Sequence, residues 1–191
     1  MQHRYFKIYK PYGYLSQFIT NERPRKKKKL LGELGDFPDE TMSVGRLDQD
    51  SEGLLFLTTD GKASAEVTGN KIEKEYYVQV DGQITLGAIK KIQLGVEISI
   101  NGKSYNTLPC KAFILEERPE FPERAKKIRD ERHGPTSWIS VTLVEGKFRQ
   151  VKKMTAAVGF PTLRLVRVRI GNEKLDKMDA GEVIELTEFS Y

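Results

Sequence analysis

The chain has 191 residues and carries 32 Lys and Arg against 27 Asp and Glu, a formal net charge of +5. Its one cysteine, Cys110, excludes an internal disulfide and indicates a reducing compartment. The amino end shows no apolar leader, and no run approaches the roughly 20 apolar residues of a membrane span. We therefore expect a soluble, cytoplasmic protein with one sizeable core.

Positive charge is concentrated in two stretches of the chain. Residues 145–169 hold seven Lys or Arg against Glu145 alone, and residues 22–29 hold six against Glu22. Clustered basic residues are typical of proteins that follow a phosphate backbone, although a solvated face or loop gives the same pattern. The charge distribution therefore favours a nucleic-acid partner without proving one.

Apolar patterning predicts several strands alternating with short helices. Strands are expected at 3–9, 42–44, 54–57, 74–80, 98–105 (as a hairpin), 108–115 and 137–144. Helical segments are expected at 30–34, 61–68, 85–94 and 148–158. Leu86, Ile89 and Ile92 are expected to share one helix face, as are Phe148, Val151, Met154 and Val158. The charged, proline-containing stretch 118–135 has nearly balanced signs and reads as a long loop.

A dense polar cluster precedes the uninterrupted apolar run at 54–57. It contains Arg46, Asp48, Asp50, Ser51 and Glu52, all on a connecting loop. A loop held by a rigid buried strand suits a catalytic group, but the same residues would also satisfy the amides of an ordinary Asx turn. Asp60 is expected to cap the helix that follows.

The segment GRLDQDSEGLLFLTTDG at 45–61 closely resembles a family signature. The pattern G-R-L-D-x-D-S-x-G-L-L-L-L-T-N-D-G characterises the RsuA/RluB/RluE group of pseudouridine synthases, with mild departures here at Phe56 and Thr59. The resemblance implies an enzyme that isomerises uridine to pseudouridine in RNA, without a cofactor or metal. It also implies that Asp48 is the nucleophile and that the target base flips out of its stack.

A second motif contains the basic residue that is expected to pair with Asp48. The segment EGKFRQVKKM at 145–154 resembles E-G-R-N-R-Q-V-R-R-M, in which the first basic residue after Q-V pairs with the catalytic aspartate; here that is Lys152. Family members commonly have Arg at this position and the next, whereas this chain has Lys152 and Lys153, and lysine cannot form a bidentate fork. Phe148 replaces a frequent Asn.

The remaining site residues also follow from the resemblance. Tyr76, in a K-x-Y strand, is either an ordinary core aromatic or, as in the family, the ring that stacks on the target base. Four basic residues are expected to contact RNA: Arg46, Lys10, Arg149 and Lys153. The run 25–29 is a further basic loop near RNA or merely in solvent.

The fold is expected to be α+β, with a mixed, largely antiparallel, bent sheet, flanking helices and two lobes around a catalytic cleft. Residues 1–191 would form a single catalytic domain, with lobe one at roughly 1–68 plus 146–191 and lobe two at roughly 70–145. Three segments, YLSQF at 14–18, PTSW at 135–138 and MTAAVGFPTLRLVRVRIG at 154–171, resemble the branch that modifies 23S rRNA. That branch lacks an S4 domain, and we expect none here. We also expect a monomer.

Three alternatives remain open. The same chemistry could act on another structured RNA, 16S rRNA or tRNA. A non-catalytic rRNA-binding assembly factor would share the basic patches but would not need Asp48. A hydrolase using Asp48 and Asp50 as an acid/base pair would need a raised pKa on one carboxyl group.

Overall fold

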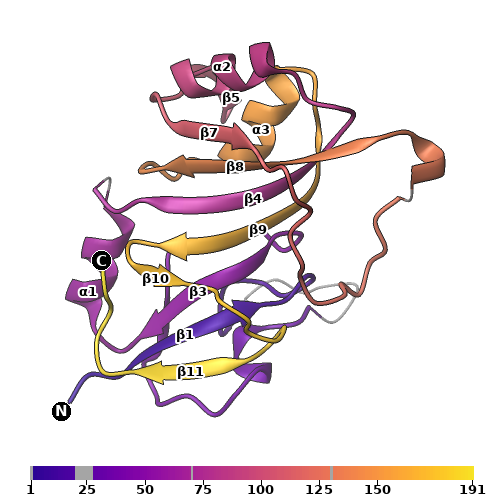
Figure 1. Ribbon diagram of the computed structural model, residues 1–191. Helices are drawn as coiled ribbons and strands as arrows, with labels where there is room; N and C mark the ends of the chain where they lie inside the picture. The colour runs from indigo at the N-terminus through magenta and orange to yellow at the C-terminus, as the bar shows by residue number, and fades with distance from the viewer. Residues whose placement is uncertain (1, 20–27, 70, 130) are drawn as a thin grey trace.

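The computed structural model describes residues 2–19, 28–69, 71–129 and 131–191 (Figure 1). In chain order its elements are β1 (Tyr5–Lys10), the 3-10 turn η1 (Leu31–Glu33), β2 (Met42–Val44), β3 (Glu52–Thr58), α1 (Gly61–Thr68), β4 (Lys74–Asp81), α2 (Leu86–Leu94), β5 (Glu97–Ile100), β6 (Lys103–Asn106), β7 (Lys111–Ile114), the 3-10 turn η2 (Glu131–His133), β8 (Thr136–Leu143), α3 (Gln150–Ala157), β9 (Thr162–Ile170), β10 (Glu173–Lys174) and β11 (Val183–Leu186).

A nine-stranded sheet runs through the described part of the chain. Its order is β11-β1-β3-β9-β4-β8-β7, with β2 added beside β3 and β10 beside β9. β3 and β9 pair in parallel, and the other neighbouring strands pair antiparallel. The expected α+β fold with a mixed, largely antiparallel sheet and flanking helices is therefore confirmed.

The central strand β3 is buried on both faces, which explains its uninterrupted apolar sequence. Leu55 and Leu57 pack in one hydrophobic cluster with β4, α2 and α3. Leu54 and Phe56 pack in a second cluster that includes residues near the carboxyl end. All seven residues of β3 are buried, as expected for a strand with no solvated face.

Local sequence signals fix the ends of several elements. The Asp60 carboxylate accepts hydrogen bonds from the amides of Lys62 and Ala63 and so caps α1, as predicted. Asn101 and Gly102, with φ of 50° and 77°, form the tight turn between β5 and β6.

Two predicted helix faces were wrong in one position each. The side chain of Leu86 is 77% exposed, and α2 instead buries Ala88, Ile89 and Ile92. Phe148 precedes α3, which begins only at Gln150, and is 63% exposed. Each residue lies at or before its helix start, where the side chain can escape the face that the periodicity assigns to it.

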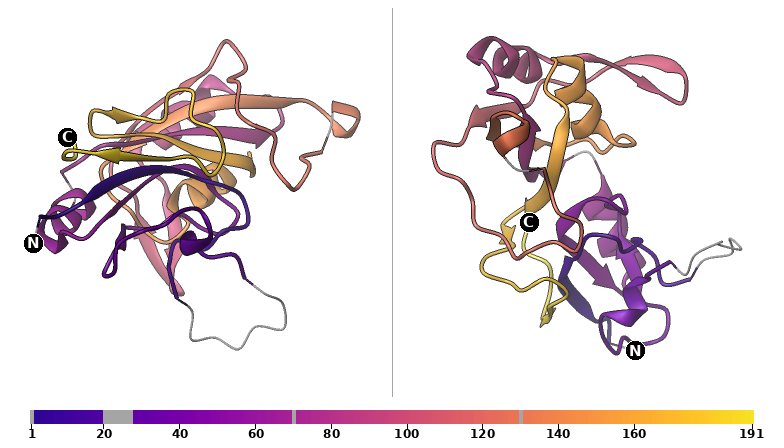
Figure 2. Two further views of the ribbon diagram at one scale, coloured as in Figure 1. Left: turned by 90° about the horizontal axis from the view of Figure 1, so that it is seen from below. Right: turned by 90° about the vertical axis from the view of Figure 1, so that its right-hand side faces the viewer.

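The two faces of the sheet carry different structures. Figure 2 shows α3 and the β5–β6 hairpin on one side, and the long segment from 115 to 135 on the other. Alternation along β4 agrees with this arrangement: Tyr76 and Val78 lie in the cluster that includes α3 residues, whereas Tyr77 packs against Phe121 of the long segment. The site described next lies on the α3 side.

Candidate active site

The loop at 45–51, between β2 and β3, is held by specific hydrogen bonds. Ser16 Oγ accepts from the Leu47 amide at 2.9 Å and donates to the Leu47 carbonyl at 2.8 Å. The Ser51 amide donates to the Asp48 carbonyl at 3.0 Å. The backbone on both sides of Asp48 is therefore fixed before any substrate arrives.

The turn between β8 and α3 is fixed by a buried carboxylate. Glu145 is 2% exposed and accepts hydrogen bonds from Gln150 Nε2, from the Leu108 amide and from the Tyr105 hydroxyl, at 2.6, 2.8 and 2.5 Å. Arg149 then adopts a left-handed conformation, with φ of 53°, immediately before α3. Such a conformation is uncommon for a residue with a side chain and is frequently found at functional sites.

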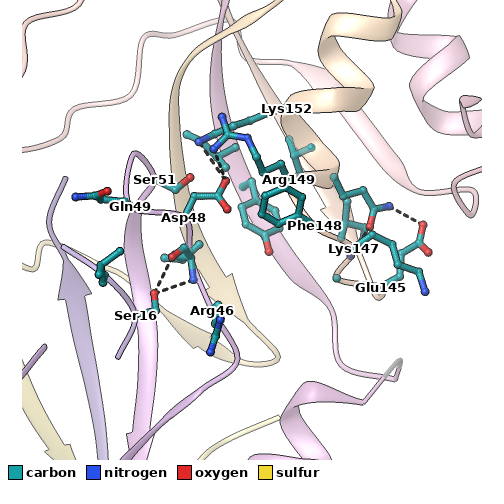
Figure 3. A pocket seen from close by; sticks show the side chains of 18 of the residues that line it. Ser16, Arg46, Asp48, Gln49, Ser51, Glu145, Lys147, Phe148, Arg149 and Lys152 are labelled. Atoms are coloured by element: carbon teal, nitrogen blue, oxygen red, sulfur yellow. Dashed lines mark hydrogen bonds and ion pairs between the residues drawn. The ribbon is translucent and has the colours of Figure 1, made fainter. Parts of the chain in front are cut away.

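A pocket of about 660 Å³ lies between this turn, the 45–51 loop and β4. Figure 3 shows residues of the loop and of the turn facing one another across it. The pocket brings together five of the seven predicted site residues: Arg46, Asp48, Tyr76, Arg149 and Lys152. Three separate segments of the sequence thus meet at one site.

Two cations and two carboxylates form an ion cluster, of which Asp48, Arg149 and Lys152 line the pocket and Asp50 lies beside it. Asp48 Oδ2 lies 3.3 Å from Lys152 Nζ and 3.4 Å from Arg149 Nη1. Asp50 takes the shorter contacts, at 2.6 Å from Lys152 and 3.1 Å from Arg149. The predicted contact between Asp48 and Lys152 is present, but Lys152 is shared with Asp50. Arg149, which was expected to contact RNA, also joins the cluster.

The cluster determines the protonation of Asp50. Burial alone would raise the pKa of its carboxyl group, but hydrogen bonds and positive charge from Arg149 and Lys152 outweigh burial and lower the pKa to about 2. The hydrogen bond to Asp50 in turn raises the pKa of Arg149. A carboxyl group with so low a pKa cannot serve as a general acid near neutral pH, so Asp50 is not the acid that the hydrolase alternative requires.

Three further residues shape the pocket. Tyr76 is 9% exposed, contributes to the core and also lines the pocket, so the two interpretations of its role are compatible. Arg46 is exposed and has no hydrogen-bond or ion-pair partner among the described residues. The exposed ring of Phe148 also lines the pocket, with Lys153 Nζ 5.1 Å from the ring centroid.

The structure corrects the expectation for Lys10. Its side chain is fully buried, with Nζ donating to the carbonyls of Pro11 and Tyr14 at 3.0 and 2.8 Å. It therefore cannot reach a phosphate and instead braces the turn beside the catalytic loop. Burial lowers its pKa to about 7.

Lys153 lies outside the pocket and donates to the Ser99 carbonyl of the β5–β6 hairpin at 2.6 Å. The basic run predicted at 25–29 lies partly outside the described residues, because positions 25–27 are not described. Lys29 packs over the ring of Tyr14, with Nζ 5.3 Å from the centroid. No RNA contact can be assigned to this run from the structure.

Sequence reasoning gave no site role to Asp50 as the main partner of both cations, or to Phe148 as an exposed ring at the pocket. The signal for Asp50 was its position two residues after Asp48 in the same polar loop. Phe148 was visible only as a departure from the frequent Asn of the family motif. The structural role of Glu145 depends on contacts with β6 and could not be read from spacing.

Comparison with known proteins defines the class. Residues 4–157 match the family model described as RNA pseudouridylate synthase. A solved structure titled "Crystal structure of pseudouridylate synthase" superposes with a TM-score of 0.75 at 28% sequence identity, covering 96% of this chain and 70% of the other. The chain therefore belongs to the RNA pseudouridylate synthase family, whose members are isomerases that convert uridine to pseudouridine.

The chain is also similar over most of its length to individual enzymes of this family. The chain is 41% identical to ribosomal large subunit pseudouridine synthase E of Vibrio vulnificus, over 93% of this chain and 73% of the relative. It is also 41% identical to the enzyme of the same name from Xanthomonas axonopodis pv. citri, over 88% of this chain and 86% of the relative. The predicted family is thus confirmed, and these relatives carry the name of the branch that the sequence motifs indicated.

Two negative findings concern only the residues that the structure describes. None of their helices has the length and apolar character needed to cross a bilayer. They also contain no group of three or more His, Cys, Asp or Glu side chains placed to hold a metal ion.

Proposed function

We propose that this enzyme converts a uridine of 23S rRNA to pseudouridine, with Asp48 as nucleophile, Tyr76 stacking on the target base and Lys152 supporting the ionised aspartate. One observation carries the proposal: Asp48 lies in a pocket beside two cations, with Tyr76 in the lining. The names of the large-subunit relatives support 23S rRNA as the substrate. We also expect the enzyme to be a cytoplasmic monomer.

The reaction is an isomerisation in which no atom is gained or lost. The bond between uracil N1 and C1′ breaks, the base rotates in the pocket, and a bond forms between C5 and C1′. C5 then loses its hydrogen as a proton, and N1 ends protonated. Attack by Asp48 on the base and assistance at C1′ both need the same ionised carboxylate, which the positive charges of Lys152 and Arg149 stabilise in the partly desolvated pocket.

Asp50 sets the positions of the two cations beside Asp48. Because it makes the shorter contacts to Lys152 and Arg149, it holds both cations in place while leaving Asp48 with longer, weaker contacts. A nucleophile locked in a tight bidentate pair would lose its reactivity. Asp50 therefore acts as a positioning residue, while Asp48 carries the chemistry.

The target uridine must leave its stack to enter the pocket. Tyr76 can stack on the flipped base, and stacking of this kind contributes roughly 1–3 kcal/mol per base. The exposed ring of Phe148 provides a second surface, for a neighbouring base. Arg46, which has no partner among the described residues, can enter the vacated stack or bind a flanking phosphate.

The substrate can be tested with transcripts that carry tritium at C5 of uridine, because pseudouridine formation releases that hydrogen to water. We expect release from unmodified 23S rRNA and none from 16S rRNA or tRNA. Release from either of the other RNAs alone would reject the substrate while keeping the chemistry. Binding of 23S rRNA without any release, under conditions where a known synthase is active, would favour an assembly factor.

The oligomeric state is a separate prediction. Light scattering after gel filtration measures the molar mass in solution and so tests whether the protein is a monomer.

A further inference from the structure

A second pocket, of about 870 Å³, lies on the opposite face of the sheet from the active site. Its floor includes Gln79 of β4 and Arg164 of β9, and its wall is formed by residues within 118–129 and by Arg132. The two pockets are back to back: Leu165 lines the active site, whereas its neighbour Arg164 lines the second pocket. The reaction described above assigns no role to this second pocket.

Charge in this pocket is strongly one-sided. Among its described lining residues are seven Lys or Arg and a single acid, Glu123. Three of the seven make contacts that connect the wall to the sheet. Arg124 donates to the Leu163 carbonyl, and Arg129 pairs with the Asp81 carboxylate. Arg164 donates to the Pro122 carbonyl at 2.8 Å and also pairs with the buried Glu52 carboxylate of β3.

Other basic side chains are available to a ligand. The side chains of Arg118, Lys126 and Lys127 are exposed and have no hydrogen-bond or ion-pair partner among the described residues. Some cations of the segment are thus engaged in contacts within the protein, and others are exposed to solvent around the pocket. Three unpaired cations around a concavity attract a ligand with several negative charges.

The floor of the pocket contains a polar group that is buried without a partner. Gln79 is 6% exposed; its Nε2 donates to Thr136 Oγ1 at 3.1 Å, but its Oε1 accepts no hydrogen bond from the described protein. Trp138, opposite Gln79 in the β4–β8 register, is 7% exposed, and its Nε1 also has no partner. An unsatisfied buried polar group destabilises the protein, and a ligand donor that reached Gln79 Oε1 would remove that penalty.

We propose that this pocket binds the substrate RNA away from the target nucleotide. Arg118, Lys126 and Lys127 contact backbone phosphates, and Gln79 Oε1 accepts a hydrogen bond from a ribose 2′-hydroxyl or a base N–H. RNA supplies both the anionic groups and the donors that the pocket requires. This inference rests on the proposed function, since it assumes an RNA substrate.

Two contacts connect the second pocket indirectly to the catalytic loop. The Arg124 guanidinium lies 4.6 Å from the centroid of the Tyr12 ring. The next residue, Gly13, donates its amide to the Gln49 carbonyl beside Asp48 at 2.8 Å. RNA bound at both pockets would therefore pass around the end of the sheet where this loop lies, holding the target uridine against the active site.

The first test reverses two of the unpaired charges. In Lys126→Glu/Lys127→Glu, we expect KM for the 23S rRNA transcript to rise at least tenfold, with kcat within about twofold of wild type. The slope of log affinity against log salt should fall by about 1.5, because each lost phosphate contact removes about 0.7–0.9. The matched control is Lys90→Glu/Lys91→Glu, an equal charge change at exposed positions of α2, which should leave KM, kcat and the slope unchanged.

A second variant tests the floor. Gln79→Met removes the unpaired acceptor while keeping similar bulk. A merely structural Gln79 predicts lower stability and unchanged KM. The proposal predicts a several-fold rise in KM and an unchanged salt slope. The melting temperature should fall only as far as loss of the hydrogen bond to Thr136 explains.

The outcomes separate this proposal from the proposed function. If the wild type releases tritium and the Lys126/Lys127 variant matches its control in KM and salt slope, the second RNA contact is overturned while the function stands. If the double variant binds naked transcript normally but fails to sediment with ribosomal precursor particles, the surface recognises protein, and the RNA proposal is also overturned. Absence of tritium release by the wild type would instead remove the function itself; affinity and salt slope would still report on the pocket.

Discussion

At the scale of single residues, catalysis depends on how two cations are divided between two carboxylates. Lys152 and Arg149 lie closer to Asp50 than to Asp48. The side chain of Lys152 is 11% exposed, so its charge is screened less by solvent than that of a surface lysine. Replacing the family's frequent Arg by Lys gives one strong contact to Asp50 and one longer contact to Asp48.

Lys152→Met should therefore lower kcat by about 10²–10³-fold, the range seen when one group that stabilises charge in an active site is removed. Lys152→Arg should recover at least a tenth of wild-type activity, because the guanidinium can contact both carboxylates. Single-turnover tritium release measures both. Full activity of the Met variant would show that Arg149 alone suffices, and failure of Arg to rescue would show that shape matters more than charge.

Lys10 gives the protein a distinctive pH dependence. Burial lowers its pKa from 10.5 to about 7 in the folded state, so the unfolded chain binds more protons at every pH between these values. Stability at this site therefore rises as pH increases from about 7 toward 10.5 and is lost again as pH falls through the folded pKa.

We expect wild type to gain about 2 kcal/mol in free energy of unfolding, relative to Lys10→Met, between about pH 7 and about pH 9. Urea denaturation of both proteins across this range measures the difference. The variant is its own control for every other titrating group. Parallel stability profiles would mean that Lys10 is protonated in the folded protein throughout.

At the scale of elements, the parallel pair β3–β9 joins the strands that carry the catalytic loop to those that carry Tyr76. Gly53 sits at the crossing with φ of 104°, and a Cβ there would lie 2.3 Å from the Arg167 carbonyl oxygen. The Arg164–Glu52 ion pair, with side chains 10% and 3% exposed, fastens the same crossing. The glycine of the family signature thus has a packing reason as well as a conformational one.

Gly53→Ala should lower the free energy of unfolding by more than about 2 kcal/mol, because backbone must move and the new residue is held at positive φ. Gly61→Ala is the control: nothing lies within 4 Å of its Cβ, and alanine favours the helix there by up to about 1 kcal/mol. Thermal or urea unfolding compares the two. Equal stability of both variants would contradict the close approach at β3–β9.

The elements were predicted well where local patterning determines them. The buried run Leu54 to Leu57, the Asp60 cap and the turn at Asn101-Gly102 all depend on neighbours in sequence. Leu86 and Phe148 were misplaced because helix periodicity says nothing about where a helix begins. The left-handed Arg149 has no sequence signal of its own, since the buried Glu145 and contacts from distant strands impose it.

The candidate site was also predicted only in part. The family resemblance implied that Asp48 and Lys152 would meet, although they are 104 residues apart, and the structure places their charged atoms 3.3 Å apart. It did not predict that Asp50 would compete for Lys152, or that Lys10 would be buried. The first depends on how α3 packs against the loop at 45–51, and the second depends on how the turn after β1 packs against the same loop.

At the scale of the whole molecule, one sheet separates two pockets with different chemistry. The pocket with the reacting groups lies on the α3 side of the sheet, and the basic pocket lies on the other side, beneath residues 118–129. Figure 2 shows α3 and this segment on opposite sides of the sheet. The nearly balanced charge of that segment in sequence concealed the asymmetry, because folding directs many of its cations to one surface. The division into two lobes, at roughly 1–68 plus 146–191 and 70–145, stays a prediction.

The most direct test of the account is the pseudouridine content of 23S rRNA in cells that lack this gene and receive either wild type or Asp48→Asn. Chemical derivatisation followed by reverse transcription maps each pseudouridine. We predict that wild type restores one missing modification, whereas Asp48→Asn restores none and yet binds the unmodified rRNA with wild-type affinity. Restoration of the modification by Asp48→Asn would contradict the central claim that this carboxylate is the nucleophile.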